Sequence, residues 1–149
     1  NLFSRTLQSA KLQFVWEVPN DLPPLSGDKR LLGQAFSNLL DNAIKYTPTG
    51  GSITVSAELI DTEIHVHTRD TGIGIPSHIL PRIFERFYRA DKARSSEISG
   101  SGLGLAIAKH ILLQHDGRIW ADSILGQGSV FHFAVPIWND AGSTRTLWE

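Results

Sequence analysis

Two carboxamides and one ammonium group recur at helical spacing within residues 34–46. At about 100° per residue, Asn38, Asn42 and Lys45 project from one side of a helix, within an arc of about 60°. Carboxamide oxygens suit a hydrated cation, and an ammonium group suits an anion. Because most polar helix stripes are simply solvated, an ordinary exposed helix face is the competing interpretation of these residues.

The carboxylate of Asp70 is predicted to point into the core. Ile64 and Val66 face inward along a predicted strand, and the same parity continues through Thr68 to Asp70. A buried charge is costly unless it is paired, so Asp70 requires a donor from the backbone, from water or from a ligand. A carboxylate accepts from an exocyclic amine and rejects a carbonyl, which favours adenine over guanine. A solvated Asp before a glycine turn is the alternative, and the inward parity argues against it.

A third candidate is the glycine cluster at Gly100, Gly102 and Gly104, which opens a predicted helix. Glycines let backbone N–H groups approach an anion, and a helix N-terminus adds positive charge. A flexible connector would look the same. Two familiar phosphate loops are excluded. A Walker loop needs Gly-Lys-Ser/Thr, and a Rossmann fingerprint must follow an apolar strand, whereas a polar loop precedes this cluster.

The remaining charged and imidazole side chains carry weaker signals. The basic residues of the predicted loop 86–101 are interpreted as solvated surface, from which one or two could reach phosphates. His65 and His67 are predicted on the outer face of a strand, with no acidic or cysteine partner evident, so they predict no metal site. The other histidines lack the neighbours of a catalytic triad. The four tryptophans are interpreted as packing groups, because no basic stripe accompanies them.

The elements that must position these residues follow from periodicity and from turn signals. Strands are predicted at residues 12–18, 53–59, 64–69, 118–123 and 129–137. Helices are predicted from a cap at Ser26 or Asp28 to about residue 46, over 77–87 with a cap at Ser77, and over 103–115. Hairpin strands with interspersed helices predict a two-layer α/β sandwich, in which helices cover one face of a mixed, largely antiparallel sheet.

Composition narrows the class of protein. The chain has 149 residues, a net charge of −1 and 41% hydrophobic residues, which predicts one globular domain and no general attraction to nucleic acid. There is no apolar run long enough to span a bilayer and no cysteine, which fits a cytoplasmic protein. We expect the end of an upstream linker helix at 1–11, the domain at 12–137 and a C-terminal tail at 138–149. A chain that begins at Asn1 is expected to be a piece of something longer.

Four motifs, in this order and at this spacing, resemble the catalytic and ATP-binding domain of sensor histidine kinases. This family belongs to the ATPase superfamily of type II topoisomerases, heat-shock chaperones and mismatch-repair proteins, with its Bergerat-type ATP-binding fold. The segments resemble the asparagine box at 38–46 (NLLDNAIKY), the first glycine box at 70–76 (DTGIGIP), the phenylalanine box at 83–89 (IFERFYR) and the second glycine box at 100–107 (GSGLGLAI).

The resemblance implies a role for each site residue. Asn42, with Asn38 close by, would hold Mg²⁺, and Lys45 and Arg89 would contact phosphate oxygens. Asp70 would accept from the adenine amine, and residues 86–102 would form a lid over the nucleotide. The implied nucleotide-binding set is Asn38, Asn42, Lys45, Tyr46, Asp70, Gly72, Gly74, Ile75, Tyr88, Arg89, Gly100, Gly102, Leu103, Gly104 and Leu105, and the implied catalytic set is Asn38, Lys45 and Arg89.

Asn38 separates subfamilies within this resemblance. In ATP-hydrolysing relatives a glutamate four residues before the Mg²⁺ asparagine activates water, and Asn is a poor general base. The resemblance therefore implies a kinase that passes the γ-phosphate of ATP to a histidine. That histidine would lie on an N-terminal dimerisation domain, and no His precedes His65. The implied partners are this dimerisation domain, in a homodimeric parent, and a response regulator.

Two alternatives stay open at this point. The first is an anti-sigma-type serine kinase of the same superfamily, although such chains usually lack the pattern seen at Phe84 and Phe87. The second is a degenerate module that senses ATP or ADP without phosphoryl transfer. The intact Asn42, Asp70 and glycine boxes argue against such decay.

Overall fold

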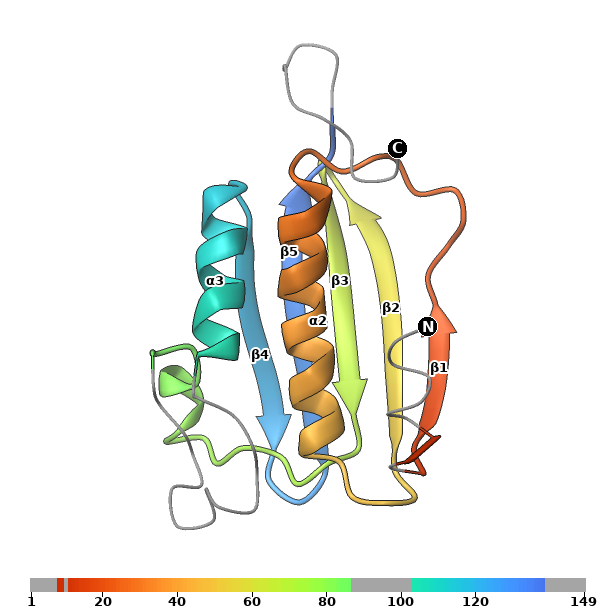
Figure 1. The fold of residues 1–149 in the computed structure, drawn as a ribbon, viewed down its shortest axis with the longest axis vertical. Helices are drawn as coiled ribbons and strands as arrows, with labels where there is room; N and C mark the ends of the chain where they lie inside the picture. The colour runs from red at the N-terminus through yellow and green to blue at the C-terminus, as the bar shows by residue number, and fades with distance from the viewer. Residues whose placement is uncertain (1–7, 10, 87–102, 139–149) are drawn as a thin grey trace.

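In the described part of the chain, one five-stranded sheet is covered on one face by two helices (Figure 1). The computed structural model describes residues 8–9, 11–86 and 103–138. Its elements are β1 (Gln13–Glu17), α2 (Lys29–Lys45), β2 (Ser52–Ile60), β3 (Glu63–Asp70), the 3₁₀ turn η1 (Leu80–Arg82), α3 (Gly104–Gln114), β4 (Arg118–Ile124) and β5 (Gly128–Pro136). The predicted two-layer sandwich is confirmed.

The sheet is mixed, with strand order β1-β2-β3-β5-β4. Edge strand β1 runs parallel to β2, while the other three pairings are antiparallel. The central pairing of β3 with β5 sets Asp70 opposite Ser129 and His67 opposite His132. These two pairs lie on opposite faces of the sheet, because side chains alternate along a strand. Asp70 therefore faces the helices, and His67 faces away from them.

Helix α2 begins and ends where its sequence predicts. The carboxylate of Asp28 accepts hydrogen bonds from the N–H groups of Arg30 and Leu31, which is a standard N-cap. Tyr46 is the C-cap, and its N–H donates to the carbonyl of Asn42. The buried side of the helix carries Leu32, Ala35, Leu39, Leu40, Ala43 and Ile44. The two predicted cap and stop signals are confirmed, with Asp28 in preference to Ser26.

The core lies between the two helices and the inward face of the sheet. One cluster joins α2 and α3 to β3 and β5 through residues such as Leu39, Leu112 and Phe131. A smaller cluster joins the other side of α2 to β1 and β2 through residues such as Leu40 and Ile53. Helix α2 spans both clusters, so its polar edge is held in a fixed position against the sheet.

The prediction of a helix over 77–87 is wrong. The structure has only the 3₁₀ turn η1, whose cap residue Ile79 makes no side-chain capping bond, and Ser77 lies in a turn. Pro81 lacks an N–H group, and the N–H groups of Arg82 and Glu85 donate to carbonyls three residues back. Trp16 is 58% exposed, and its ring packs against those of Phe14 and Phe36, with centroids 6.3 and 6.5 Å away. Beyond Arg86, the predicted loop 86–101 lies outside the described residues.

Candidate nucleotide site

The carboxylate of Asp70 is buried at the end of β3, with 5% of the residue exposed. Its Oδ1 accepts from the N–H groups of Gly72, at 2.9 Å, and Ser129, at 3.2 Å. Within the described part of the chain, both of these bonds go to the same oxygen. The other oxygen, Oδ2, is therefore the one that a further N–H donor would meet. The predicted inward carboxylate is confirmed, and its first two donors come from the backbone.

Burial raises the pKa of the Asp70 carboxyl above its ordinary value, and the two backbone hydrogen bonds from Gly72 and Ser129 act in the opposite direction. Burial is the larger effect. An additional donor at Oδ2 would favour the ionised form and offset part of the burial cost. The carboxylate of Asp70 would therefore be favoured in its ionised form by any further N–H donor at Oδ2.

The turn after Asp70 is locked to two other parts of the backbone. The N–H of Ile73 donates to the carbonyl of Tyr46, and the N–H of Gly126 donates to the carbonyl of Ile73. A Cβ at Gly72 would overlap the carbonyl oxygen of Tyr46. A Cβ at Gly74, where φ is +75°, would overlap that of Ile124. These two glycines are required by contacts within the protein, whatever ligand the turn meets.

Asn38 connects the two helices. Its Nδ2 donates to the carbonyl of Gly104 at 3.0 Å, which places the first turn of α3 against the middle of α2. This contact joins the asparagine box to the second glycine box. In Figure 1 the C-terminal end of α2 and the end of β3 lie at the lower end of the view, and α3 begins higher up, beside the middle of α2.

The polar edge of α2 continues from Asn38 to its C-terminal end through Asn42 and Lys45, and Tyr46 caps the helix. Asn42 and Tyr46 are half-buried. Lys45 forms an ion pair with Asp41 one turn earlier, at 3.1 Å. Such a surface pair contributes little stability, about 0.3–0.5 kcal/mol, so the ammonium group can exchange this partner for a stronger anion at low cost. Asn38, Asn42 and Lys45 all lie within helix α2, so the predicted common edge is present.

Gly104 differs from the glycines near Asp70. It is exposed, and a Cβ added there would meet no heavy atom within 4 Å. It is the first residue of α3, and the half-buried side chains of Leu103 and Leu105 flank it. In the described part of the chain, protein packing gives no reason for a glycine at this position. Four further predicted site residues, Tyr88, Arg89, Gly100 and Gly102, lie outside the described residues.

Sequence reasoning missed the residues on β4 and β5 that support the turn. Ser123 accepts a hydrogen bond from the N–H of Ile75 at 2.7 Å and shares another with the hydroxyl of Ser129 at 2.8 Å. Ser129 also supplies the second donor to Asp70. No local motif marks these serines. Only the pairing of β3 with β5 and of β5 with β4 brings them to the site.

No protein-only metal cage is present in the described ranges, since no three His, Asp or Glu side chains there are grouped to hold an ion. A nucleotide-bound cation does not need such a cage, because Mg²⁺ usually keeps several waters and takes most of its ligand charge from phosphates. The neutral carboxamides of Asn38 and Asn42 fit that ligand chemistry. In the part of the chain that the structure describes, no helix is long and apolar enough to cross a membrane.

The chain matches the family of histidine kinase-, DNA gyrase B- and HSP90-like ATPases over residues 27–139. It is 45% identical over 132 residues to the adaptive-response sensory kinase SasA of Synechococcus elongatus, covering 88% of this chain and 34% of that protein. The sensor histidine kinase WalK of Bacillus subtilis is 40% identical over 127 residues, covering 84% of this chain and 21% of that protein. The chain thus spans about a third of the length of the first of these relatives, and less of the second.

Solved structures of histidine kinases superpose closely. The mycobacterial sensor histidine kinase MprB is 33% identical with a TM-score of 0.76, covering 91% of this chain and 89% of that one. Full-length ShkA in complex with AMPPNP is 31% identical with a TM-score of 0.81, covering 95% of this chain and 29% of that one. Histidine kinase ThkA in complex with the response regulator TrrA is 28% identical with a TM-score of 0.75, covering 92% and 37%.

The buried carboxylate, the asparagine edge and the glycine turns thus lie in a fold that these comparisons share. The chain belongs to the histidine kinase-, DNA gyrase B- and HSP90-like ATPase family, as an ATP-binding catalytic domain of the histidine kinase type.

Proposed function

We propose that this domain binds ATP with Mg²⁺ and presents the γ-phosphate to a histidine on a separate dimerisation domain of its parent protein. The observation that carries the proposal is the buried Asp70, whose Oδ1 already holds two backbone donors. Its Oδ2 accepts from the exocyclic amine of adenine. Guanine presents a carbonyl at the same place, and two acceptors repel, so the site selects adenine nucleotides.

The phosphate end of the nucleotide is proposed to lie between α2 and α3. Asn42 contributes a carboxamide oxygen to Mg²⁺, and Asn38 lies on the same edge while its amide holds the carbonyl of Gly104. Lys45 moves from Asp41 to a phosphate oxygen. Tyr46 and Ile75 line the nucleotide pocket. The open space at Gly104 supports close approach of a phosphate to the first N–H groups of α3, where the helix dipole favours negative charge.

Bound Mg²⁺ would neutralise phosphate charge during transfer, and the protein would supply position and electrostatics. Asn38 has no basic group with which to activate water, so the nucleotide is held without rapid loss to hydrolysis. Lys45 and Arg89 are the proposed cationic residues at the transferred phosphate. The attacking group is an imidazole nitrogen of the dimerisation domain, and a response regulator then receives the phosphoryl group. By similarity, ShkA in complex with AMPPNP supports the nucleotide, and ThkA in complex with TrrA supports the response regulator.

A mixing experiment tests the proposal. The chain is incubated with radiolabelled ATP and Mg²⁺, alone and with the dimerisation fragment of its parent. We expect acid-labile phosphate on the dimerisation fragment and none on the chain alone. Because ATP is the donor, the domain is proposed to act in the cytoplasm. Acid-stable phosphate on a serine-containing partner would instead support the anti-sigma-type kinase, and ATP binding without any transfer would support the nucleotide-sensing module.

The proposed division of the chain follows from the same elements. Residues 12–137 form the ATP-binding domain, residues 1–11 end a linker helix from the dimerisation domain, and residues 138–149 form a tail. The family match over 27–139 supports the main part of this division. Limited proteolysis tests it, and a stable fragment that begins well after residue 12 would contradict the assignment of β1 to the domain.

A further inference from the structure

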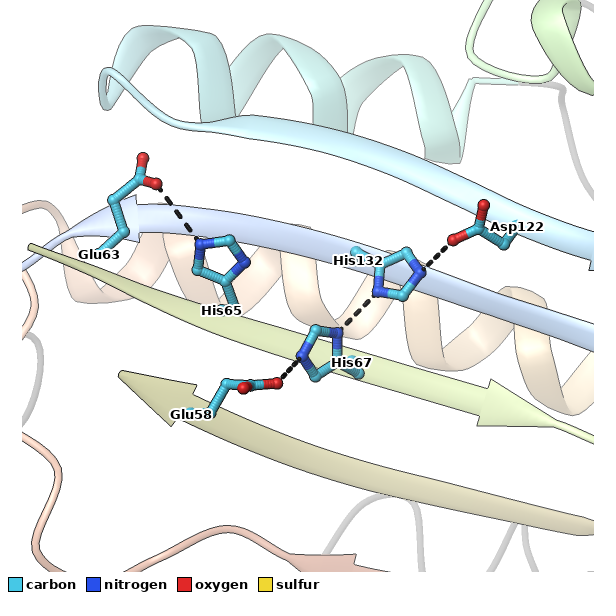
Figure 2. A network of polar contacts seen from close by, with 6 residues as sticks. All are labelled: Glu58, Glu63, His65, His67, Asp122 and His132. Carbon is cyan, nitrogen blue, oxygen red and sulfur yellow. Dashed lines mark hydrogen bonds and ion pairs between the residues drawn. The ribbon is translucent and has the colours of Figure 1, made fainter. Parts of the chain in front are cut away.

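The outer face of the sheet carries a chain of polar side chains that the nucleotide site does not use. Glu58, His67, His132 and Asp122 come from four adjacent strands and form one row (Figure 2). His67 Nε2 lies 2.8 Å from Glu58 Oε2, and His132 Nε2 lies 2.8 Å from Asp122 Oδ2. Between them, the two Nδ1 atoms are 2.7 Å apart.

This row corrects the interpretation that the strand histidines have no acidic partners. The partners are present, but they come from β2 and β4, across the sheet. His67 lies opposite Ser56 on β2, with Glu58 two residues farther along that strand, and His132 lies opposite Trp120, with Asp122 two residues beyond. Sequence reasoning would have needed the full strand order to find these neighbours.

Counting protons shows what the row requires. Each carboxylate oxygen at 2.8 Å needs a donor, so each ring places a hydrogen on its Nε2. The contact between the two Nδ1 atoms needs one more hydrogen, because two lone pairs at 2.7 Å would repel. Three hydrogen bonds thus need three ring protons, whereas two neutral imidazoles carry only two. With both carboxylates ionised, the geometry is satisfied when the pair carries one excess proton.

The surroundings indicate how this proton is shared. Burial lowers the pKa of His132, and the hydrogen bond from its Nε2–H to Asp122 is the main effect in the opposite direction. Trp120 stacks on His132 with ring centroids 5.1 Å apart, which limits access of water to that ring. Burial thus favours the arrangement in which Nδ1 of His132 accepts the hydrogen that lies between the two rings.

Other charged groups face the pair from neighbouring strands. They are Glu63, His65 and Arg69 on β3 and Arg118 on β4, together with Glu58 and Asp122. Glu63 is engaged by Arg118 at 3.1 Å, and His65 Nε2 lies 3.4 Å from Glu63 without a well-directed hydrogen bond. Arg69 disfavours a charge on His132. Glu58 and Asp122 are the two carboxylates in direct contact with the pair, and their two negative charges favour its single positive charge.

We propose that His67 and His132 form one proton-binding site, which holds a single excess proton and thereby strengthens the pairing of β3 with β5. Loss of the proton at alkaline pH leaves two lone pairs facing each other. Addition of a second proton at acid pH leaves two N–H groups facing each other. Both changes make the two rings repel each other. The hydrogen bond between His67 and His132 therefore forms only in the pH range in which the pair holds one excess proton.

The sign of the linkage gives a sharp expectation. In the unfolded chain both rings titrate near the ordinary histidine pKa of about 6.5. Above that pH, folding takes up a proton, so the contribution to stability falls as pH rises. Below it, folding releases a proton, so the contribution falls as pH drops. The contribution of the pair is greatest near pH 6.5 and changes by up to about tenfold in the unfolding constant per pH unit on each side.

The test compares urea unfolding of the whole chain with that of the double variant His67→Gln/His132→Gln between pH 5 and 9, so that no ring of the pair titrates in the reference. The control is His110→Gln, which removes an exposed histidine on α3, outside the row. We expect the difference between wild type and the double variant to pass through a maximum near pH 6.5. The difference between wild type and His110→Gln should show no maximum. A difference between wild type and the double variant that changes in only one direction with pH would overturn the proposal.

A second measurement does not depend on a variant that folds. Imidazole nitrogen resonances of the wild-type chain are followed by NMR across the same pH range, with and without a chelator. We expect the rings of His67 and His132 to respond together in two separate steps, one for each proton. Independent single steps would contradict a shared proton. A stability maximum that disappears with the chelator and returns with Zn²⁺ would assign the space between the rings to a metal ion instead.

Discussion

The two glycine boxes have different physical reasons for their glycines. At Gly72 and Gly74 a side chain would overlap the backbone of Tyr46 and Ile124, so the protein itself demands glycine. At Gly104 a side chain would meet nothing within 4 Å, so packing within the described residues makes no such demand. The first box is a structural junction between α2, β3 and the turn between β4 and β5. Gly104 of the second box provides open space at a helix N-terminus.

This difference separates stability from binding. Substitutions in the first box should affect folding, because they force backbone segments apart. Substitution in the second should leave folding intact and affect only what approaches the helix. The contrast gives a set of experiments in which each box serves as a control for the other.

The largest expected effect is that of Gly74→Ala. A left-handed backbone with a Cβ costs about 1–2 kcal/mol, and overpacking against Ile124 adds about 1–3 kcal/mol. We expect a loss of about 2–5 kcal/mol in the free energy of unfolding, measured in urea. The matched control is Gly126→Ala, which has φ of +84° but open space around its Cβ. Equal losses for the two variants would show that contact with Ile124 does not matter.

The next effect concerns binding at Gly104. Gly104→Ala should lower ATP affinity by about tenfold, because a methyl group occupies space at the N-terminus of α3. Its melting temperature should stay unchanged or rise slightly, since Ala favours helix more than Gly does. Calorimetric titration and thermal unfolding measure the two quantities on one sample. Unchanged ATP affinity would contradict the assignment of this space to phosphate.

A smaller effect is expected from substitution of Asn38, which joins the asparagine box to the second glycine box. Asn38→Glu should raise the slow release of phosphate from ATP, because a carboxylate can act as a base where a carboxamide cannot. The variant also loses the amide donor to Gly104. Asn38→Asp, with a shorter carboxylate, is a control for the lost bond. No rise in phosphate release above that control would count against the role of Asn38 in keeping ATP intact.

The smallest effect follows from the raised pKa of Asp70. Binding needs the ionised carboxylate, so affinity should fall as pH drops, beginning at a higher pH than an ordinary aspartate at about 3.9 would give. Adenosine is the suitable probe, because it has no phosphate to titrate. The fall should be absent in Asp70→Asn. Adenosine affinity that stays constant from pH 7 to 5 and falls only near pH 4 would contradict the raised pKa.

Much of this architecture could be predicted because the information is local. The parity of Ile64, Val66 and Thr68 placed Asp70 in the core, and the carboxylate of Asp28 marked the start of α2. The failures arose where distant segments meet. Ser129 and Ser123 reach the site only through strand pairing, and the acidic partners of His67 and His132 come from β2 and β4. A helix was predicted where only the short turn η1 forms, because Pro81 supplies no N–H group to continue helical bonding.

The role of Asp70 in binding adenine is tested most directly by titrating ATP and GTP, with Mg²⁺, into the wild-type chain and into Asp70→Asn. The wild-type chain should bind ATP and reject GTP. The variant should unfold like the wild type but bind ATP about 100-fold more weakly or worse, because a charged acceptor for the adenine amine is lost. Undiminished ATP affinity in a folded Asp70→Asn variant would contradict the assignment of Asp70 as the residue that recognises adenine.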